Sequence, residues 1–377
     1  MDVAGWWRRR IPLRLSWPEV SRKVGLVGTS IVRVDESVLG VEVRLSLRPP
    51  ATVQIVESVA DQIAVAYGAT RVRVIADKDR ADRATVFVDW VAGLGPVPYP
   101  DLHHPVGIPA DPLRPLPLGL NDRGVVVEAQ LYGHSVLVGG NPGSGKSHAL
   151  RVFLAGLANC RNVALFGVDP KYVELGMWRE RFTSLVLGNE VAATAELLTI
   201  LLAEVDRRAR RLQTLEGAAL LPSFEDPWVV LVVDEWAELG ADGERKERDE
   251  IARLLRRFVS LGRAVGCTAI LCTQRPTSDA VDTGTRSLLT DRFALKCGDR
   301  YQADSILPPG SYAPADLLGA RPGRALWSDG GPATALQFYE VADSAVADLV
   351  QPGFRVGLNP GRWVGSGGGQ PNCPASG

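Results

Sequence analysis

The residues with the clearest chemical role lie at positions 138–149, which read VGGNPGSGKSHA. They fit the pattern G-x-x-x-x-G-K-[ST], in which backbone N–H groups curl round phosphate oxygens and a lysine reaches the β- and γ-phosphates. The serine hydroxyl of this pattern can bind Mg²⁺, so the run predicts a site for ATP and Mg²⁺ at the start of the next helix. The predicted nucleotide-binding residues are Gly140, Asn141, Pro142, Gly143, Ser144, Gly145, Lys146, Ser147 and His148, with Lys146 also catalytic and Ser147 also a metal ligand.

An apolar strand that ends in two acids supplies the second half of such a site. Residues 228–239 read WVVLVVDEWAEL, which places Asp234 where it can hold Mg²⁺ through water. Glu235 beside it is placed to polarise a water molecule for in-line attack on the γ-phosphate. A transient switch needs no such base, so the pair of acids indicates a protein that turns ATP over.

A glutamine marks the end of a third predicted strand. The sequence CTAILCTQRPTSD at 267–279 carries Gln274 just past the carboxyl end of this strand. Ligands gather at that edge of a parallel sheet, so Gln274 is placed to sense the γ-phosphate and to pass its presence on to the following loop. Together the three strand ends predict ATP hydrolysis.

The elements that position these residues fall into two blocks. The first block alternates strand patterns of period two with the helical stretch VQIVESVADQIAVAYG at 53–68, which predicts a small α+β unit. Beyond Gly119 the pattern is strand–helix–strand, which predicts an α/β fold with a parallel sheet covered by helices. The predicted parts are an N-terminal arm at 1–29, the small α+β domain at 30–95, a Pro-rich linker at 96–118, the ATPase domain at 119–350 and a mobile Gly/Pro-rich tail at 351–377.

Composition limits the classes of protein to which the chain can belong. A net charge of −1 over 377 residues argues against a uniformly basic surface, so contact with nucleic acid needs local groups of Lys and Arg or several copies facing one another. The five cysteines lack metal-ligand spacing, and we expect reduced thiols in the cytoplasm. No window approaches the roughly 20 apolar residues of a membrane span. The arginine-rich N-terminus has no apolar region behind it that would make a signal peptide.

Several motifs resemble, in order and spacing, those of the FtsK/SpoIIIE family of ring-forming DNA translocases. The resemblance runs from about 115 to 340, and residues 56–90 are similar to that family's α domain. The motifs VDPK and TQRP are more specific than the phosphate loop, which many unrelated folds share. The matching segments are LPLGLNDRGVVVEAQLYGHSVLVGGNPGSGKS at 116–147, VDPKYVEL at 168–175, EVDRRARRL at 204–212, VVDEWAEL at 232–239, GRAVGCTAILCTQRP at 262–276 and TDRFALKCGDRYQADSIL at 290–307.

The resemblance implies a RecA-like motor that assembles as a hexamer round double-stranded DNA. Each ATP site would then lie at a subunit boundary and take a catalytic arginine from the neighbouring subunit. Arg292 in TDRFALKC occupies the position of that arginine in the family, and it starts a predicted strand after a polar turn, where no core role is evident. Arg263 and Arg275 are rival candidates, with salt bridges inside the subunit as their alternative role.

Two features of longer family members have no counterpart in the sequence. Those proteins carry transmembrane helices ahead of the motor and a winged-helix γ domain behind it, and the Gly/Pro-rich residues after Gln351 cannot form such a domain. SILPPG at 305–310 and GARPGRALW at 319–327 look closer to the short motors of conjugative plasmids and integrative elements of actinobacteria, which transfer double-stranded DNA between cells. Such a motor would be recruited to the inner face of the cell membrane by a membrane-bound partner.

Other functions stay open on the sequence alone. A chromosome-segregation or cell-division motor lies in the same class, and the ATPase of a type VII-like protein secretion system shares the motor fold. A nucleotide switch without translocation is the remaining alternative. The sequence does not identify DNA-contacting residues, because the basic run RRARRL, with Arg207, Arg208, Arg210 and Arg211 on one helix, is typical of a solvated or intersubunit face.

Overall fold

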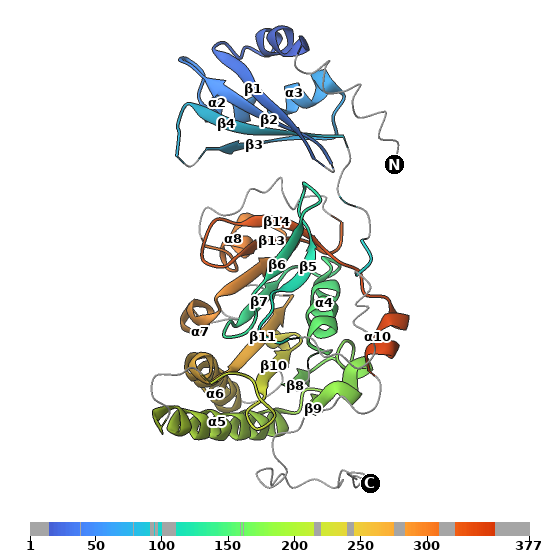
Figure 1. Cartoon of the computed structure of the whole chain (residues 1–377), viewed down its shortest axis with the longest axis vertical. Helices are drawn as coiled ribbons and strands as arrows, with labels where there is room; N and C mark the ends of the chain where they lie inside the picture. The colour runs from blue at the N-terminus through green and yellow to red at the C-terminus, as the bar shows by residue number, and fades with distance from the viewer. Residues whose placement is uncertain are drawn as a thin grey trace.

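The computed structural model shows two folded units, the first ending near Trp90 and the second beginning near Asp111 (Figure 1). Residues 15–23 form a helix ahead of the first unit. Among the helices that the structure describes, none combines the length and the apolar character needed to cross a bilayer. Most of the predicted linker and all of the predicted tail lie outside the described residues. The structure describes residues 15–37, 39–77, 79–90, 94, 97–99, 111–158, 160, 162–214, 220–239, 245–274, 283–308 and 321–350.

The first unit is a four-stranded antiparallel sheet with two short helices packed against it. Alternate residues of the central strands face the helices, so that Val43 and Val86 are buried in one cluster with Val56 and Ile63. The single helix expected at 53–68 is two helices, because the backbone leaves helical geometry at Val59. The strand order is β1-β2-β4-β3, with β1 Thr29–Glu36, β2 Gly40–Leu47, α2 Val53–Ser58, α3 Ala60–Tyr67, β3 Arg71–Ala76 and β4 Arg83–Asp89.

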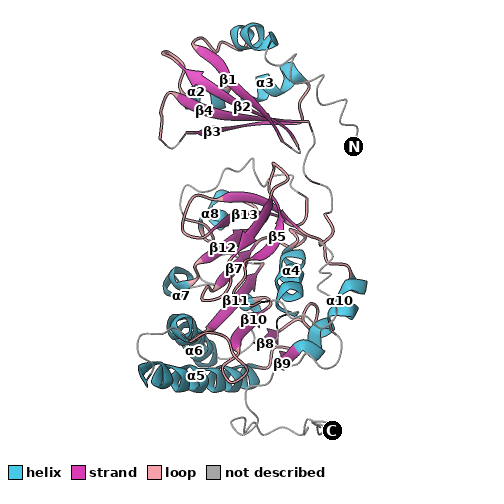
Figure 2. Cartoon of the chain, in the orientation of Figure 1, coloured by secondary structure: helices cyan, strands magenta, loops and turns pink. Residues whose placement is uncertain are grey.

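The second unit is built on one large sheet, in which the described strands lie in the order β6-β5-β14-β13-β12-β7-β11-β10-β8-β9 (Figure 2). Neighbours pair in parallel from β9 to β12 and antiparallel from β12 to β6. The predicted parallel sheet is present, and the four antiparallel strands extend it in a way that the sequence did not predict. The bounds are β5 Leu116–Leu120, β6 Val126–Ala129, β7 Val136–Gly139, β8 Val163–Asp169, β9 Phe182–Leu187, β10 Trp228–Val233, β11 Cys267–Thr273, β12 Asp291–Ala294, β13 Arg324–Ser328 and β14 Thr334–Phe338.

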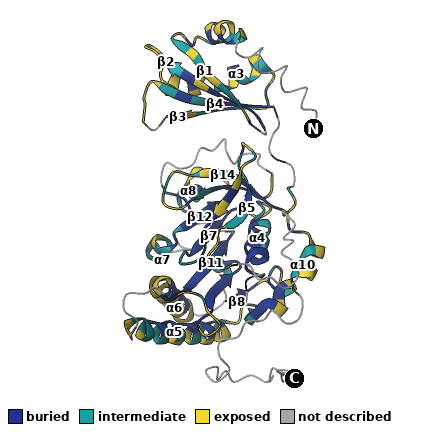
Figure 3. Cartoon of the chain, in the orientation of Figure 1, coloured by how far each residue is buried: buried dark blue, intermediate teal, exposed yellow. Residues whose placement is uncertain are grey.

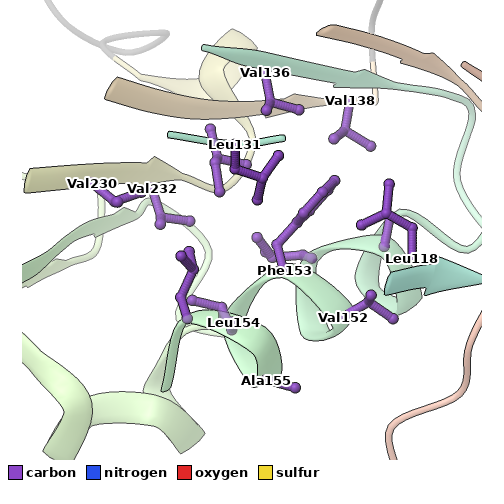
Figure 4. Packing of buried hydrophobic residues seen from close by; sticks show 14 of the residues in the cluster. Leu118, Leu131, Val136, Val138, Val152, Phe153, Leu154, Ala155, Val230 and Val232 are labelled. Carbon is purple, nitrogen blue, oxygen red and sulfur yellow. The ribbon is translucent and has the colours of Figure 1, made fainter. Parts of the chain in front are cut away.

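Helices cover both faces of this sheet, and the strands between them are mostly buried (Figure 3). The strand side chains pack in two layers, one on each face. In β10, Val230 and Val232 join the layer with α4, whereas Val229, Leu231 and Val233 join the layer with α5 and α6. Figure 4 shows α4 against the first layer. A continuous apolar strand is therefore buried on both sides. The bounds are α4 Lys146–Ala158, α5 Val191–Thr214, α6 Arg245–Gly262, α7 Thr283–Leu288, α8 Arg300–Asp304 and α10 Asp343–Leu349, with 3₁₀ turns η1 Gly176–Arg181, η2 Trp236–Glu238 and η3 Arg263–Val265.

The basic run at 207–212 belongs to α5, and part of it is internal. Arg208 is only 1% exposed, and its guanidinium donates to the carbonyls of Pro227 and Val265 at 2.8 and 3.2 Å. Arg207 forms an ion pair with Asp226 at 2.5 Å. The solvated face expected here is wrong for Arg208, because α5 turns this side chain toward carbonyls beside the amino ends of β10 and β11.

A buried ion cluster joins the two units. Asp122, in the turn between β5 and β6, pairs with Arg73 of β3 at 2.8 Å and with Arg324 of β13 at 2.6 Å. Figure 1 shows this turn directed toward the first unit. Burial alone would raise the pKa of Asp122, but the guanidiniums of Arg324 and Arg73 outweigh burial and lower the pKa. The side chains in these pairs are at most 8% exposed. Without Asp122, Arg324 would lose a buried partner, whereas Arg73 would keep its ion pair with Asp89 at 3.2 Å.

Replacing Asp122 by alanine should destabilise the chain by about 3–5 kcal/mol, because Arg73 and Arg324 would lose a shared buried carboxylate. Urea unfolding of the full chain, followed by circular dichroism and tryptophan fluorescence, measures the shift. Asp82→Ala is the matched control, since Asp82 pairs with Arg80 at the surface and its side chain is 46% exposed. Equal midpoints for the two variants would mean that the buried joint does not form in solution.

Candidate ATP site

The predicted phosphate loop connects the end of β7 to the start of α4. Gly143 and Gly145 adopt positive φ angles of 75° and 92°, which glycine takes without the strain of a side chain. A Cβ on Gly145 would lie 1.9 Å from the backbone nitrogen of Gly323, so a larger residue has no room there. Helix α4 begins at Lys146 directly after the loop, which turns the positive end of the helix toward a bound phosphate.

Three neighbouring segments hold the loop in shape. The N–H of Gly140 donates to the carbonyl of Thr273 at the end of β11, at 3.2 Å. The N–H of Asn141 donates to the carbonyl of Lys296 after β12, at 2.9 Å. Gly323, ahead of β13, donates its N–H to the carbonyl of Ser144 at 2.8 Å. The antiparallel extension of the sheet therefore forms one wall of the loop.

Lys146 is buried among the acids at the end of β10. Its ammonium bonds to Oδ1 of Asp234 and lies 3.5 Å from Oε2 of Glu235, and its side chain is 5% exposed. Burial alone would lower the pKa of Lys146, but the carboxylates of Asp234 and Glu235 raise it instead. The lysine thus stays charged and paired inside the site, ready to exchange its carboxylate partners for phosphate oxygens.

Of the residues predicted as Mg²⁺ ligands, Ser147 lies in the first turn of α4 and Asp234 directly follows β10. Burial raises the pKa of Asp234, and the nearby carboxylates of Asp169 and Glu174 raise it further. A bound cation would stabilise the ionised form of Asp234 against these effects. Mg²⁺ usually takes one or two carboxylates, with waters and substrate phosphates as its other ligands. The described residues contain no cluster of three His, Cys, Asp or Glu side chains arranged as a metal site. One hydroxyl and one carboxylate form the donor set expected for an ion whose other ligands are waters and nucleotide phosphates.

Glu235, the predicted base, follows β10 in an unusual backbone conformation. Its φ angle is 61°, which a non-glycine residue adopts at a cost of about 1–3 kcal/mol and mostly at functional sites. Its side chain is 1% exposed. Both carboxylate oxygens accept the N–H of Gln274, at 2.9 and 3.1 Å, and Thr273 Oγ1 lies 3.3 Å from one of them. The end of β11 thus holds Glu235 against the phosphate loop.

Gln274 meets Glu235 through its backbone N–H, and its role in sensing the γ-phosphate stays a prediction. Arg292 does not bond to the described residues of this ATP site. Its guanidinium donates to the carbonyls of Leu289 and Arg286 in its own chain, at 2.9 Å each. Arg292 is half-buried and so has two backbone partners that the sequence did not reveal, and its catalytic role stays a prediction. Of the rivals, Arg263 is exposed in η3, and Arg275 lies outside the described residues.

The sequence did not predict three residues of the site, which lie at or just after the end of β8. Asp169 ends β8 beside β10, Lys171 lies 3.7 Å from Glu235 Oε2, and Glu174 accepts the hydroxyl proton of Ser147. The motif VDPKYVEL contains all three, and its position after a buried strand was the available signal. Acids at the ends of adjacent parallel strands meet at one edge of the sheet.

Comparisons with known proteins agree on one family. Residues 110–220 match the sequence profile of the FtsK/SpoIIIE family. The transfer protein TraSA of Streptomyces ambofaciens is 30% identical over 316 residues, which cover 77% of this chain and 72% of TraSA. The DNA translocase FtsK of Lactiplantibacillus plantarum is 31% identical over 223 residues, covering 53% of this chain but only 27% of that protein.

Solved structures share the fold at lower identity. The conjugation coupling protein TcpA of pCW3, solved with ATPγS, is 18% identical with a TM-score of 0.59, over 91% of this chain and 99% of TcpA. The type VII secretion ATPase EccC of Thermomonospora curvata is 22% identical with a TM-score of 0.53, over 69% of this chain and 33% of the EccC chain. At these identities the likeness concerns the fold, which is that of RecA-like P-loop ATPases.

Proposed function

Because the chain belongs to the FtsK/SpoIIIE family, a family of P-loop ATPases, we propose that it hydrolyses ATP to move along double-stranded DNA. The matched relatives include a transfer protein over most of its length, and this supports DNA transfer between cells as the task. We further propose that copies of the chain form a hexameric ring round the duplex. Such a ring suits a chain of net charge −1, because several copies can gather cationic side chains on one inner surface.

The position of Glu235 is the observation that best supports ATP hydrolysis. Its carboxylate lies between the ammonium of Lys146 and the backbone N–H of Gln274, and it directly follows Asp234. We infer that Lys146 moves from the carboxylates to the β- and γ-phosphates when ATP binds. Glu235 then polarises the attacking water, while the N–H of Gln274 keeps its carboxylate in place.

Ser147 and Asp234 are the residues that would hold Mg²⁺. When bound, the ion neutralises charge that develops on the phosphate oxygens. The backbone N–H groups of Gly143, Gly145 and Lys146, at the start of α4, orient the same phosphates, whereas the N–H of Ser144 donates to the carbonyl of Asn141. With Mg²⁺ bound, the site would combine the backbone N–H donors, the ammonium of Lys146, the ion and the carboxylate of Glu235. These are the kinds of group that phosphoryl transfer to water uses.

Turnover of ATP by the assembled chain should be slow alone and should rise strongly with duplex DNA of any sequence. A motor that steps through every sequence must contact the phosphate backbone, because base edges differ from step to step. Raising salt from about 50 to 200 mM should weaken DNA binding about 10³–10⁵-fold if 6–10 phosphates are contacted. The rate of phosphate release with duplex DNA, single-stranded DNA and no DNA measures how far each kind of DNA stimulates turnover. A rate indifferent to duplex DNA in assembled protein would reject the DNA motor and favour the secretion ATPase.

A further inference from the structure

The hydroxyl of Ser147, the proposed Mg²⁺ ligand, already has a partner in the structure. Ser147 Oγ donates its proton to Oε1 of Glu174, which lies beyond the end of β8 rather than on the strand that carries Asp234. A hydroxyl has one proton and two lone pairs, so an oxygen that binds a cation must give its proton to another acceptor. Asp234, the other nearby acid, is bonded to Lys146.

The segment that presents Glu174 is fixed by its own backbone. Asp169 is fully buried, and its carboxylate accepts the N–H groups of Lys171, Glu174 and Leu175 at 3.0–3.1 Å. Tyr172 within this segment takes a left-handed conformation with a φ angle of 62°. The side chain of Glu174 contributes to none of these bonds, so replacing it leaves the segment its means of folding.

The second oxygen of Glu174 faces the same helix. Arg151, one turn after Ser147 in α4, places its Nε 3.8 Å from Glu174 Oε2 and its Nη1 2.7 Å from Asp343. Oε2 is buried and has no hydrogen-bond partner within the described part of the chain. Oε2 thus faces Arg151, and Oε1 is the oxygen that serves Ser147.

We propose that Glu174 is a positioning residue for Mg²⁺: it takes the proton of Ser147 and so directs the lone pairs of Oγ toward the ion. The inference rests on the proposed function, because it assumes that Mg²⁺ accompanies ATP at Ser147. Glu174 touches neither the phosphates nor the attacking water in this scheme. Its loss should therefore change the dependence on Mg²⁺ and leave the binding of metal-free nucleotide intact.

Titrating Mg²⁺ against the full chain and an N-methylanthraniloyl-labelled ATP tests this by fluorescence, without relying on turnover. Glu174→Ala should raise the half-saturating Mg²⁺ concentration about 10–100-fold, the usual effect of removing a residue that orients a metal ligand. Its affinity for the labelled ATP in EDTA should stay as in the unaltered chain. Glu174→Gln keeps an acceptor oxygen and should restore most of the Mg²⁺ affinity. Glu250→Ala, which removes an exposed glutamate paired with Arg253, is the matched control.

A double-mutant cycle separates this role from a packing effect. In a Ser147→Ala background no hydroxyl proton remains, so Glu174→Ala should add little further loss of Mg²⁺ affinity. Additive losses, or an unchanged Mg²⁺ dependence in Glu174→Ala, would overturn the proposal. If Glu174→Ala proves unstable to heat, Glu174→Leu, which keeps the side-chain bulk, takes its place. Nucleotide binding without any Mg²⁺ dependence in the unaltered chain would instead reject the proposed function.

Discussion

Replacing Glu235 by glutamine should lower kcat for ATP hydrolysis by about 10²–10⁴, the contribution of a general base. The amide keeps an oxygen that can accept the N–H of Gln274, so the local structure and the binding of ATP with Mg²⁺ should be retained. Phosphate release at saturating ATP, together with the affinity for labelled ATP, separates the two effects.

Glu238→Gln is the matched control for Glu235. Glu238 lies three residues further on, approaches Lys171 at 3.8 Å, and its side chain is 31% exposed. Its replacement should lower kcat far less than that of Glu235, since its ion pair is with Lys171 and not with Lys146. If Glu235→Gln also kept full turnover, another group would have to activate the water.

Arg292→Ala should reduce hydrolysis by about 10³–10⁵ if Arg292 serves the site of a neighbouring subunit. To do so the guanidinium must leave the carbonyls of Leu289 and Arg286, and ATP binding should not change. Mixing Arg292→Ala with Lys146→Ala should then recover part of the activity, because some boundaries pair an intact phosphate loop with an intact arginine. Turnover across a series of mixing ratios measures the recovery.

Arg263→Ala is the comparison variant, because Arg263 is the other described candidate for the catalytic arginine and is exposed in η3. Absence of recovery in mixed rings shown to assemble would mean that Arg292 acts only inside its own chain, by holding the segment between α7 and β12. A thermal unfolding shift in Arg292→Ala, with no change in kcat, would point to the same structural role.

The sequence predicted those parts of the site that depend on local pattern. Residue order and apolar runs predict three parts of the site, and the structure contains all of them: the phosphate loop, the buried strand before Asp234 and the strand before Gln274. The contact between Gln274 and Glu235 could not be read in detail, because it uses a backbone N–H whose direction depends on how β10 and β11 pair.

Features that depend on distant segments were missed. The carboxylate of Asp169 accepts N–H groups of the segment that follows it, including that of Glu174. This fold of the segment brings the Glu174 side chain to Ser147. Arg208 looked like a solvated arginine because the sequence does not show which carbonyls its helix face will meet. The antiparallel strands were missed for a similar reason, since β5 and β14 pair across more than two hundred residues of chain.

The wall formed by Gly323 sets a limit on how the chain can be shortened. Gly323 supports the loop through Ser144, and it is itself held by the N–H of Phe338, while the side-chain amide of Gln337 donates to the carbonyl of Pro322. A fragment that stopped after β12 would keep every letter of the phosphate-binding motif and lose this support. The smallest fragment able to present a preformed loop therefore extends through β14, well beyond the residues that define the motif.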